Sequence, residues 1–173
     1  MAVRKILTYP DEVLRKPAEP VADIDGRLQQ LINDMADTMY HAPGIGLAGN
    51  QVGAPCRVII FDVSAKDEPR DLCVVINPEI IESGGEVASE EGCLSVVDYS
   101  AEIKRAQFVT VKGFDREGNP VLLKKEGLPA IVLQHEIDHL NGKLFIDHIS
   151  RLKRELYKRR LRKKLKEKRP RRL

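Results

Sequence analysis

The chain has 173 residues, of which 42% are hydrophobic and 32% are charged, so it is long enough for one domain with its own core and has the composition of an ordinary soluble protein. No apolar run approaches the roughly 20 residues of a membrane span, and residues 1–6 lack the long apolar stretch of a signal peptide, so we expect a cytoplasmic protein that enters no membrane. The net charge of +3 hides a strong asymmetry: residues 151–173 carry 14 Lys and Arg against 2 Glu, a net charge of +12, whereas residues 1–150 carry −9.

The first half of the chain predicts an amphipathic helix followed by a glycine-rich loop. Five apolar side chains recur at helical spacing over residues 25–40 and form a stripe typical of a core: Leu28, Leu31, Ile32, Met35 and Met39. Pro43 and Gly44 end this helix. The stretch at 44–51 is rich in glycine but lacks the Gly-Lys-Ser/Thr ending of a phosphate-binding loop.

The second half predicts strands and then a helix. Four β-branched, apolar runs indicate strands at residues 57–63, 73–77, 108–115 and 120–124. The last two are joined by a hairpin-like turn, and a helix follows over residues 128–141, with Gly142 as its C-terminal cap. This order predicts an α+β fold, with mixed or antiparallel strands packed around the helix of residues 128–141.

The basic end predicts one more helix. Ser150 can cap it, and four leucines form a narrow apolar seam: Leu152, Leu156, Leu161 and Leu165. Residues 168–173 lack the apolar periodicity to continue it as ordered structure. We therefore expect a main domain of residues 1–150 and a basic helix and tail of residues 151–173. Such a tail suits a polyanionic partner, and the alternative is a merely solubilising helix.

Residues 135–139 spell His-Glu-Ile-Asp-His, the HExxH pattern. His135 and His139 lie four residues apart on one face of the predicted helix and can bind one divalent metal ion, with Glu136 beside it as a candidate general base. A solvated helix with two unrelated histidines is the alternative. Apolar residues on both sides of the pattern indicate instead a buried helix, in which charged groups need partners such as a metal ion.

The common third ligands downstream of HExxH are missing. Phe145 stands where a metzincin has its third histidine. A thermolysin-like site needs a downstream glutamate, and those after His139, Glu155 and Glu167, both lie in the basic tail. His148 has a different spacing and is expected at the surface or at the start of a helix.

The three cysteines offer a ligand upstream. Their odd number fits a reducing compartment. Cys93 follows a glycine in a segment without strong strand or helix character, and a thiolate with two imidazoles suits Zn²⁺ or Fe²⁺ and leaves one position for water. Cys56 and Cys73 lie in or beside apolar strand runs and are expected to be inert core residues.

Three stretches resemble the signature motifs of the peptide deformylase family: GIGLAGNQ at 44–51, EGCLS at 91–95 and QHEIDHLNG at 134–142. Their order and separations fit, and the resemblance spans nearly the whole chain. Gly49 stands where the first motif usually has alanine, a change that removes no functional group. The resemblance implies a metal-dependent hydrolase that removes the N-formyl group from the formyl-methionine of newly made polypeptides and releases formate.

The resemblance also implies roles for individual residues. It assigns the metal to Cys93, His135 and His139, the proton transfers to Glu136, and the stabilisation of an oxyanion to the Gln51 side chain and the Leu94 backbone N–H. The expected metal is Fe²⁺, with Zn²⁺, Ni²⁺ or Co²⁺ able to occupy the site. From the residue alone, Gln51 is equally well read as a turn residue that caps a loop.

The same resemblance implies a substrate pocket and a partner. Ile45, Leu128 and Ile131, with the His135 ring, would enclose the methionine side chain. Core packing is the alternative for the three aliphatic residues. Gly46 would admit the peptide backbone. Apart from the resemblance, we expect Glu91, which precedes Cys93, to pair with Arg105 and orient the loop. The segment from Arg151 to Leu173 would dock on the ribosome near the peptide exit.

Two other functions are compatible with the motifs. One is a metalloendopeptidase of another HExxH class. The other is an RNA- or ribosome-binding protein with a structural zinc, for which Cys56 or Cys73 would have to supply a fourth ligand.

Overall fold

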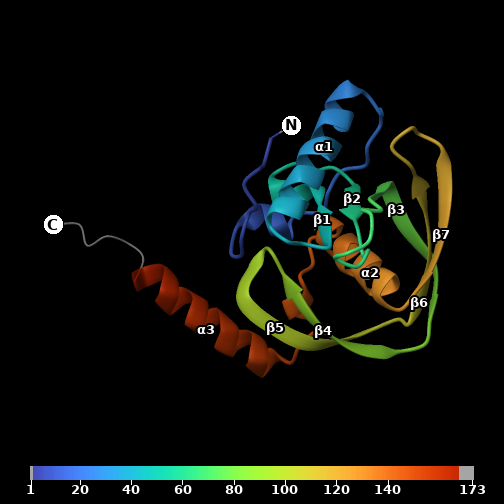
Figure 1. Cartoon of the computed structure of the whole chain (residues 1–173). Helices are drawn as coiled ribbons and strands as arrows, with labels where there is room; N and C mark the ends of the chain where they lie inside the picture. The colour runs from blue at the N-terminus through green and yellow to red at the C-terminus, as the bar shows by residue number, and fades with distance from the viewer. Residues whose placement is uncertain (1, 168–173) are drawn as a thin grey trace.

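The structure is a computed structural model that describes residues 2–167 (Figure 1). Within this range the fold is α+β, as predicted, and its strand ladders are antiparallel throughout. The elements, in chain order, are the 3₁₀ turn Glu12–Arg15, α1 (Gly26–His41), β1 (Gly46–Ala48), the 3₁₀ turn Gly49–Val52, β2 (Val58–Phe61), β3 (Cys73–Gly84), β4 (Val87–Cys93), β5 (Val96–Arg105), β6 (Phe108–Phe114), β7 (Pro120–Glu126), α2 (Leu128–Leu140), the 3₁₀ turn Phe145–Asp147 and α3 (Arg151–Glu167).

A five-stranded sheet, in the order β1-β2-β3-β6-β7, forms the body of the fold. All four residues of β2 are buried, because α1 packs on one face of this strand and α2 on the other (Figure 1). Val58 and Ile60 face the α1 side, whereas Ile59 and Phe61 face α2. Alternation of side chains along a strand thus explains why this short run is apolar throughout. The α2 helix is central, as expected.

The first helix forms where the periodicity predicts it. The Asp25 carboxylate accepts hydrogen bonds from the N–H groups of Arg27 and Leu28, both at 3.0 Å, and so caps the helix. The five predicted apolar residues of its stripe are all buried. The four predicted strands are also present, although β3 runs well beyond Asn77, to Gly84.

The β4–β5 hairpin is the main element that the sequence did not predict. The sequence around Cys93 has no strong strand or helix character, yet Cys93 is the last residue of β4, which pairs with β5 in a separate two-stranded sheet. No strand was predicted there because β4 is largely polar: only Glu91 of its seven residues is buried. A strand without an apolar face carries little local signal.

The C-terminal helix begins at Arg151, where the Ser150 carbonyl accepts from the Arg154 N–H at 3.0 Å. The predicted leucine seam is largely wrong. Leu152 is 71% exposed, and the side chain that anchors the helix is instead Tyr157, which is 5% exposed. The helix extends away from the body (Figure 1), so only one side of its middle turns finds apolar partners. The prediction for residues 168–173 lies outside the described residues. Between residues 2 and 167, no helix is long and apolar enough to cross a membrane.

Candidate active site

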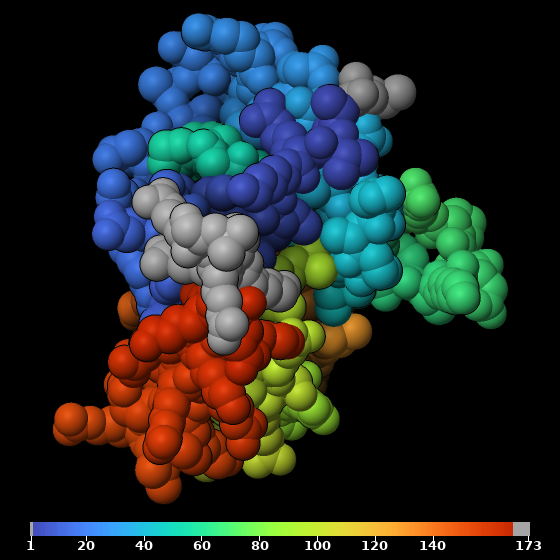
Figure 2. Space-filling view, turned by 90° about the vertical axis from the view of Figure 1, so that its left-hand side faces the viewer, coloured from blue at the N-terminus to red at the C-terminus, as the bar shows by residue number. Residues whose placement is uncertain are grey.

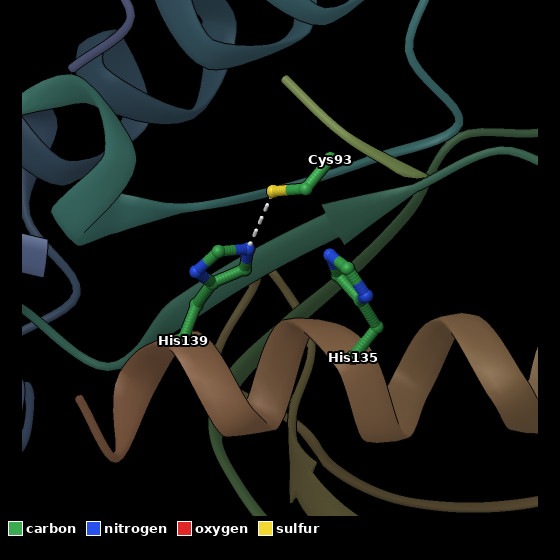
Figure 3. Close-up of side chains that lie close together, drawn as sticks. All are labelled: Cys93, His135 and His139. Atoms are coloured by element: carbon green, nitrogen blue, oxygen red, sulfur yellow. Dashed lines mark hydrogen bonds between the residues drawn. The ribbon is translucent and has the colours of Figure 1, made fainter. Parts of the chain in front are cut away.

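Three potential metal ligands come together where β4 ends above α2. The Cys93 thiol and the imidazoles of His135 and His139 each offer one ligand atom, and these atoms lie within 4.8 Å of one another. The Cys93 Sγ lies 3.2 Å from His139 Nε2. Figure 3 shows both imidazoles rising from the same face of α2 toward the thiol. Helical spacing brings the histidines together, whereas the β4–β5 hairpin brings in the cysteine.

The two imidazoles differ in their hydrogen-bond partners and in the direction of their pKa shifts. His135 Nδ1 lies 2.8 Å from Glu91 Oε2, which leaves Nε2 free on the side of the thiol. Although burial alone would lower the pKa of His135, its interactions with Cys93 and Glu91 raise that pKa well above its usual value. Burial lowers the pKa of His139 well below its usual value, which favours the neutral form of the ring, the form that binds metals.

Behind His135 lies a buried network of charges. Arg105 donates to both Glu91 oxygens, at 2.7 and 3.0 Å, and to Asp138 Oδ2 at 2.5 Å. Burial opposes the charge of both carboxylates, yet these bonds, with His135 at Glu91 and His148 at Asp138, lower each pKa to about 2. The expected Glu91–Arg105 pair is confirmed. The carboxylate of Glu91 is therefore directed at Arg105 and His135.

Two members of this network had no expected role. Asp138 lies inside the HExxH pattern, one residue before the second histidine, and joins Arg105 to His148. His148 lies between the turn Phe145–Asp147 and α3, near the surface as expected, with its Nε2 2.7 Å from Asp138 Oδ2. Arg105 is the last residue of β5. Nothing in the neighbouring sequence indicates that its side chain lies beside α2.

A cavity of about 390 Å³ opens beside the three ligands, and we call it the main cavity. It is lined by Pro43, Gly44, Ile45, Gly46, Gln51, Ser89, Glu90, Glu91, Gly92, Cys93, Leu94, Leu128, Ile131, Val132, His135 and Glu136. Every residue expected at the site is in this set except His139, which is 1% exposed. Ser89 and Glu90 were missed because they belong to the unpredicted hairpin. Val132 was missed because an apolar residue of a buried helix is first read as core.

Glu136 points a buried carboxyl group into this region. Its Oε2 has no hydrogen-bond partner among residues 2–167, and burial raises its pKa to about 7. A Cβ atom on Gly46 would collide with Glu136 Oε1 and lie 3.0 Å from Val132 Cγ1. Gly46 was expected to admit a peptide backbone, and the structure adds that only glycine lets β1 approach Glu136 this closely.

Gln51 is held rigidly at the edge of the cavity. Its Oε1 accepts from the Ala48 N–H at 2.8 Å. Its Nε2 lies 3.0 Å from Ser95 Oγ and 3.6 Å from Cys93 Sγ, so the amide N–H₂ faces the thiol. The side chain thus both caps the turn Gly49–Val52 and points a donor at the ligand cluster. The interpretation of Gln51 as a turn residue and its interpretation as a donor in the site are therefore compatible.

The other two cysteines lie away from this cluster. Cys56 and Cys73 are half-buried, pack beside apolar clusters and have thiols whose pKa is raised by burial. In the part of the chain that the structure describes, neither joins the metal-ligand group. Neither cysteine therefore supplies the fourth ligand that a structural zinc site would need.

The family model of polypeptide deformylase matches residues 3–155. The chain belongs to the polypeptide deformylase family. The peptide deformylase of Desulfosudis oleivorans is 56% identical over 168 residues, which cover 96% of this chain and 97% of that protein. A peptide deformylase structure from Legionella pneumophila has a TM-score of 0.89 at 50% identity and covers 98% of this chain and 100% of its own. A class I type b peptide deformylase of Acinetobacter baumannii, with Met-Ala-Ser bound, has a TM-score of 0.81 at 36% identity, covering 86% and 99%.

The family resemblance of the three motifs is thus confirmed. As a peptide deformylase, the protein is a hydrolase that removes the N-formyl group from newly made polypeptides. Deformylases are metalloenzymes, and the group formed by Cys93, His135 and His139 is a possible metal site. Because the chain belongs to this family, we set aside both alternatives: the metalloendopeptidase and the RNA- or ribosome-binding protein with a structural zinc.

Proposed function

We propose that Cys93, His135 and His139 bind the catalytic metal ion, physiologically Fe²⁺, and that Zn²⁺, Ni²⁺ or Co²⁺ can take the same site. The donor set supports this assignment, because one thiolate and two imidazoles suit these ions and three protein ligands leave a position open. The proximity of the three donor atoms and the Glu91 contact to His135 fit as well. When bound, the metal supplies a Lewis acid that polarises the formyl carbonyl and makes water more acidic.

Glu136 is the proposed proton carrier. Water adds to the formyl carbon, and Glu136 takes the proton that this water loses. The carbon–nitrogen bond then breaks, and Glu136 gives the proton to the departing amine, so that formate and a free amino terminus result. Two observations carry this assignment: Glu136 lines the main cavity together with Cys93 and His135, and one of its carboxyl oxygens has no hydrogen-bond partner among residues 2–167.

Gln51 and Leu94 are the proposed oxyanion donors. The tetrahedral carbon carries a negatively charged oxygen, and donors aimed at that oxygen stabilise it. The Gln51 side chain is supported by the position of its Nε2 near Cys93 and by the bond that locks its Oε1. Leu94 directly follows Cys93 and lines the main cavity, which supports its backbone N–H as the second donor.

The methionine side chain is proposed to lie against Ile45, Leu128 and Ile131. The first two are 47% and 49% exposed and stand at the mouth of the cavity, whereas Ile131 is 8% exposed. Exposed apolar side chains around a concave site are typical of ligand recognition. Gly46, on β1 at the edge of the sheet, can pair with the peptide backbone. Glu91 contributes to substrate binding indirectly, by holding His135.

The activity predicts a specific product pattern. Incubation with formyl-Met-Ala-Ser should release one formate per intact Met-Ala-Ser, because the site reacts at the formyl carbonyl. A chelator should abolish the reaction, and Fe²⁺ added without oxygen should restore more activity than Zn²⁺ if iron is the physiological ion. Mass spectrometry of the peptide with a formate assay measures both. Cleavage of the Met–Ala bond, or activity in metal-free protein, would contradict the proposal.

The basic C-terminal segment is proposed to bind the ribosome, while residues 1–150 form the catalytic domain in the cytoplasm. A reduced Cys93 thiol suits that compartment, where formylated chains are made. Support for docking comes from α3, which projects from the body (Figure 1) and exposes Arg159, Lys163 and Lys166 together on one surface. Phosphate groups of ribosomal RNA are the partner that such a surface fits.

This docking predicts a site-dependent loss of affinity. Because Tyr157 anchors α3 in the core, deleting the segment would also damage the fold, and point substitutions are the better test. Replacing Arg159, Lys163 and Lys166 with alanine should weaken co-sedimentation with ribosomes at ~0.15 M salt by roughly tenfold or more, and should reduce the salt dependence of binding.

The matched control removes the same charge elsewhere. Lys5, Lys66 and Lys124 are exposed residues outside α3, and their replacement with alanine should leave co-sedimentation nearly unchanged. Turnover of formyl-Met-Ala should be normal in both triple variants. Equal losses of ribosome binding in the two would show that only net charge matters and would refute docking through α3.

A further inference from the structure

A second cavity lies between α3, the N-terminal segment and the start of β5. Its volume is about 380 Å³, and it shares no lining residue with the main cavity. Figure 2 shows this side of the molecule, with α3 in red beside the N-terminal segment in blue and the hairpin in yellow-green. We call it the α3 groove, and its lining residues are Thr8, Tyr9, Val97, Asp98, Tyr99, Tyr157, Arg160, Leu161, Lys164 and Leu165.

Aromatic rings form one part of the groove wall. The ring centroid of Tyr99 lies 4.7 Å from that of Tyr157, and the Tyr9 centroid lies 6.3 Å from it. Val97 and Leu165 stand beside the rings and are 47% and 43% exposed. Large apolar side chains that remain exposed around a concave surface indicate a surface that binds something.

One polar atom deep in this wall lacks a partner. Tyr157 is 5% exposed, and its hydroxyl oxygen has no hydrogen bond among residues 2–167. A buried phenol hydroxyl normally finds a partner, since leaving it unpaired costs free energy. A ligand in the groove that carries hydrogen-bonding groups would supply this partner.

The rim of the groove is basic. Lys164 is paired with Asp98, whereas Arg160, one helical turn earlier, makes no hydrogen bond or ion pair within the described range. The helix around it, Arg151–Glu167, carries ten Lys and Arg against two Glu. Arg160 is therefore available to an anionic group whose other end lies against the tyrosines.

We propose that the α3 groove binds one nucleotide of single-stranded RNA, with its base against the tyrosine wall and its phosphate at Arg160. A basic groove with aromatic side chains is the general device for binding single strands. In one nucleotide, the base can form a hydrogen bond with the Tyr157 hydroxyl while the phosphate binds Arg160. An acidic side chain of a protein partner could not make both contacts at once. The inference rests on the proposed docking of α3 on an RNA-containing partner and adds a defined contact to it.

The test compares two basic residues of α3. Binding of a fluorescently labelled eight-nucleotide RNA to the full chain, measured by anisotropy at ~0.15 M salt, should weaken roughly fivefold more in Arg160→Ala than in Lys153→Ala. Both variants lose one positive charge from the same helix, but only Arg160 lines the groove, and Lys153 is an exposed residue outside the surface of Arg159, Lys163 and Lys166. Equal losses, or no binding of the RNA by the unmodified protein, would overturn the proposal.

A second variant removes only the unpartnered hydroxyl. Tyr157→Phe keeps the ring and should unfold at the same temperature or higher, yet bind the RNA roughly fivefold more weakly. Adenosine monophosphate should displace the RNA, whereas inorganic phosphate at the same concentration should not. Unchanged RNA affinity in Tyr157→Phe, or equal displacement by an octaglutamate peptide, would overturn the assignment to RNA. This assay contains no ribosome. A negative result would therefore refute the nucleotide site but not the docking of α3 on the ribosome, which the co-sedimentation experiment tests separately.

Discussion

Glu136→Gln should retain the bound metal but lose turnover by roughly 10²- to 10⁴-fold, the usual contribution of a positioned acid–base group. Glutamine has nearly the same shape, so it should fill the space beside Gly46 without disturbing Cys93 or His135. It cannot take the proton from the attacking water. The other two carboxylates that line the main cavity have partners of their own: Glu91 is held by Arg105 and His135, and Glu90 accepts from Ser100 Oγ.

The measurement needs two readouts and a control. Metal content per chain and kcat for formyl-Met-Ala should be determined on the same preparation. Glu90→Gln is the matched control, since Glu90 also lines the main cavity but is exposed and accepts a hydrogen bond from Ser100 Oγ at 2.6 Å. This variant should keep its turnover within a few-fold. Normal turnover by metal-loaded Glu136→Gln would rule out the assignment of Glu136 as the proton carrier.

Arg105→Ala should be the most damaging substitution outside the cavity. The Arg105 side chain is 5% exposed and lies between Glu91 and Asp138. Its removal leaves the buried Glu91 and the partly buried Asp138 without their arginine, and breaking a buried ion pair in this way typically costs about 3–5 kcal/mol of folding free energy. Because Glu91 then loses the group that orients it toward His135, metal affinity should also fall by roughly 10- to 100-fold.

Lys104→Ala is the matched control, one residue earlier on β5. Lys104 pairs with Glu86 at the surface, where the two side chains are 72% and 64% exposed, so its loss should cost less than about 1 kcal/mol. Denaturant unfolding of the metal-free proteins compares the stabilities, and competition with a metal-binding dye compares the affinities. Arg105→Lys should recover part of both, since lysine restores the charge but not the forked geometry. If Arg105→Ala and Lys104→Ala behaved alike, the network would have no role in holding His135.

The elements with a strong local pattern were all predictable. The stripe of α1, the apolar run of β2 and the buried helix α2 each place one kind of side chain at a fixed period, and that period is a property of the local chain. The HExxH pattern belongs to the same class, since helical geometry alone puts His135 and His139 on one face. Cys93 was a candidate third ligand from its chemistry and from the lack of a downstream ligand, and the resemblance to a family then assigned it.

The remaining features depend on residues far apart in the chain. The β4–β5 hairpin is mostly polar, so the sequence predicted neither strand. This hairpin nevertheless places Cys93 and Glu91 in contact with His139 and His135, which lie more than forty positions later in the chain. The same holds for Arg105 beside Asp138, for Gly46 against Glu136, and for Tyr157, which replaced the expected leucines as the anchor of α3.

The sequence by itself therefore determined the α+β class, the helix that carries the HExxH pattern, and a basic C-terminal helix, because each is encoded in composition or local periodicity. Only the tertiary structure decided how these parts meet. It brought Cys93 to the two histidines through a polar hairpin, held His135 through a charge network, and formed the α3 groove. Such contacts join distant segments, and no local pattern of the chain encodes them.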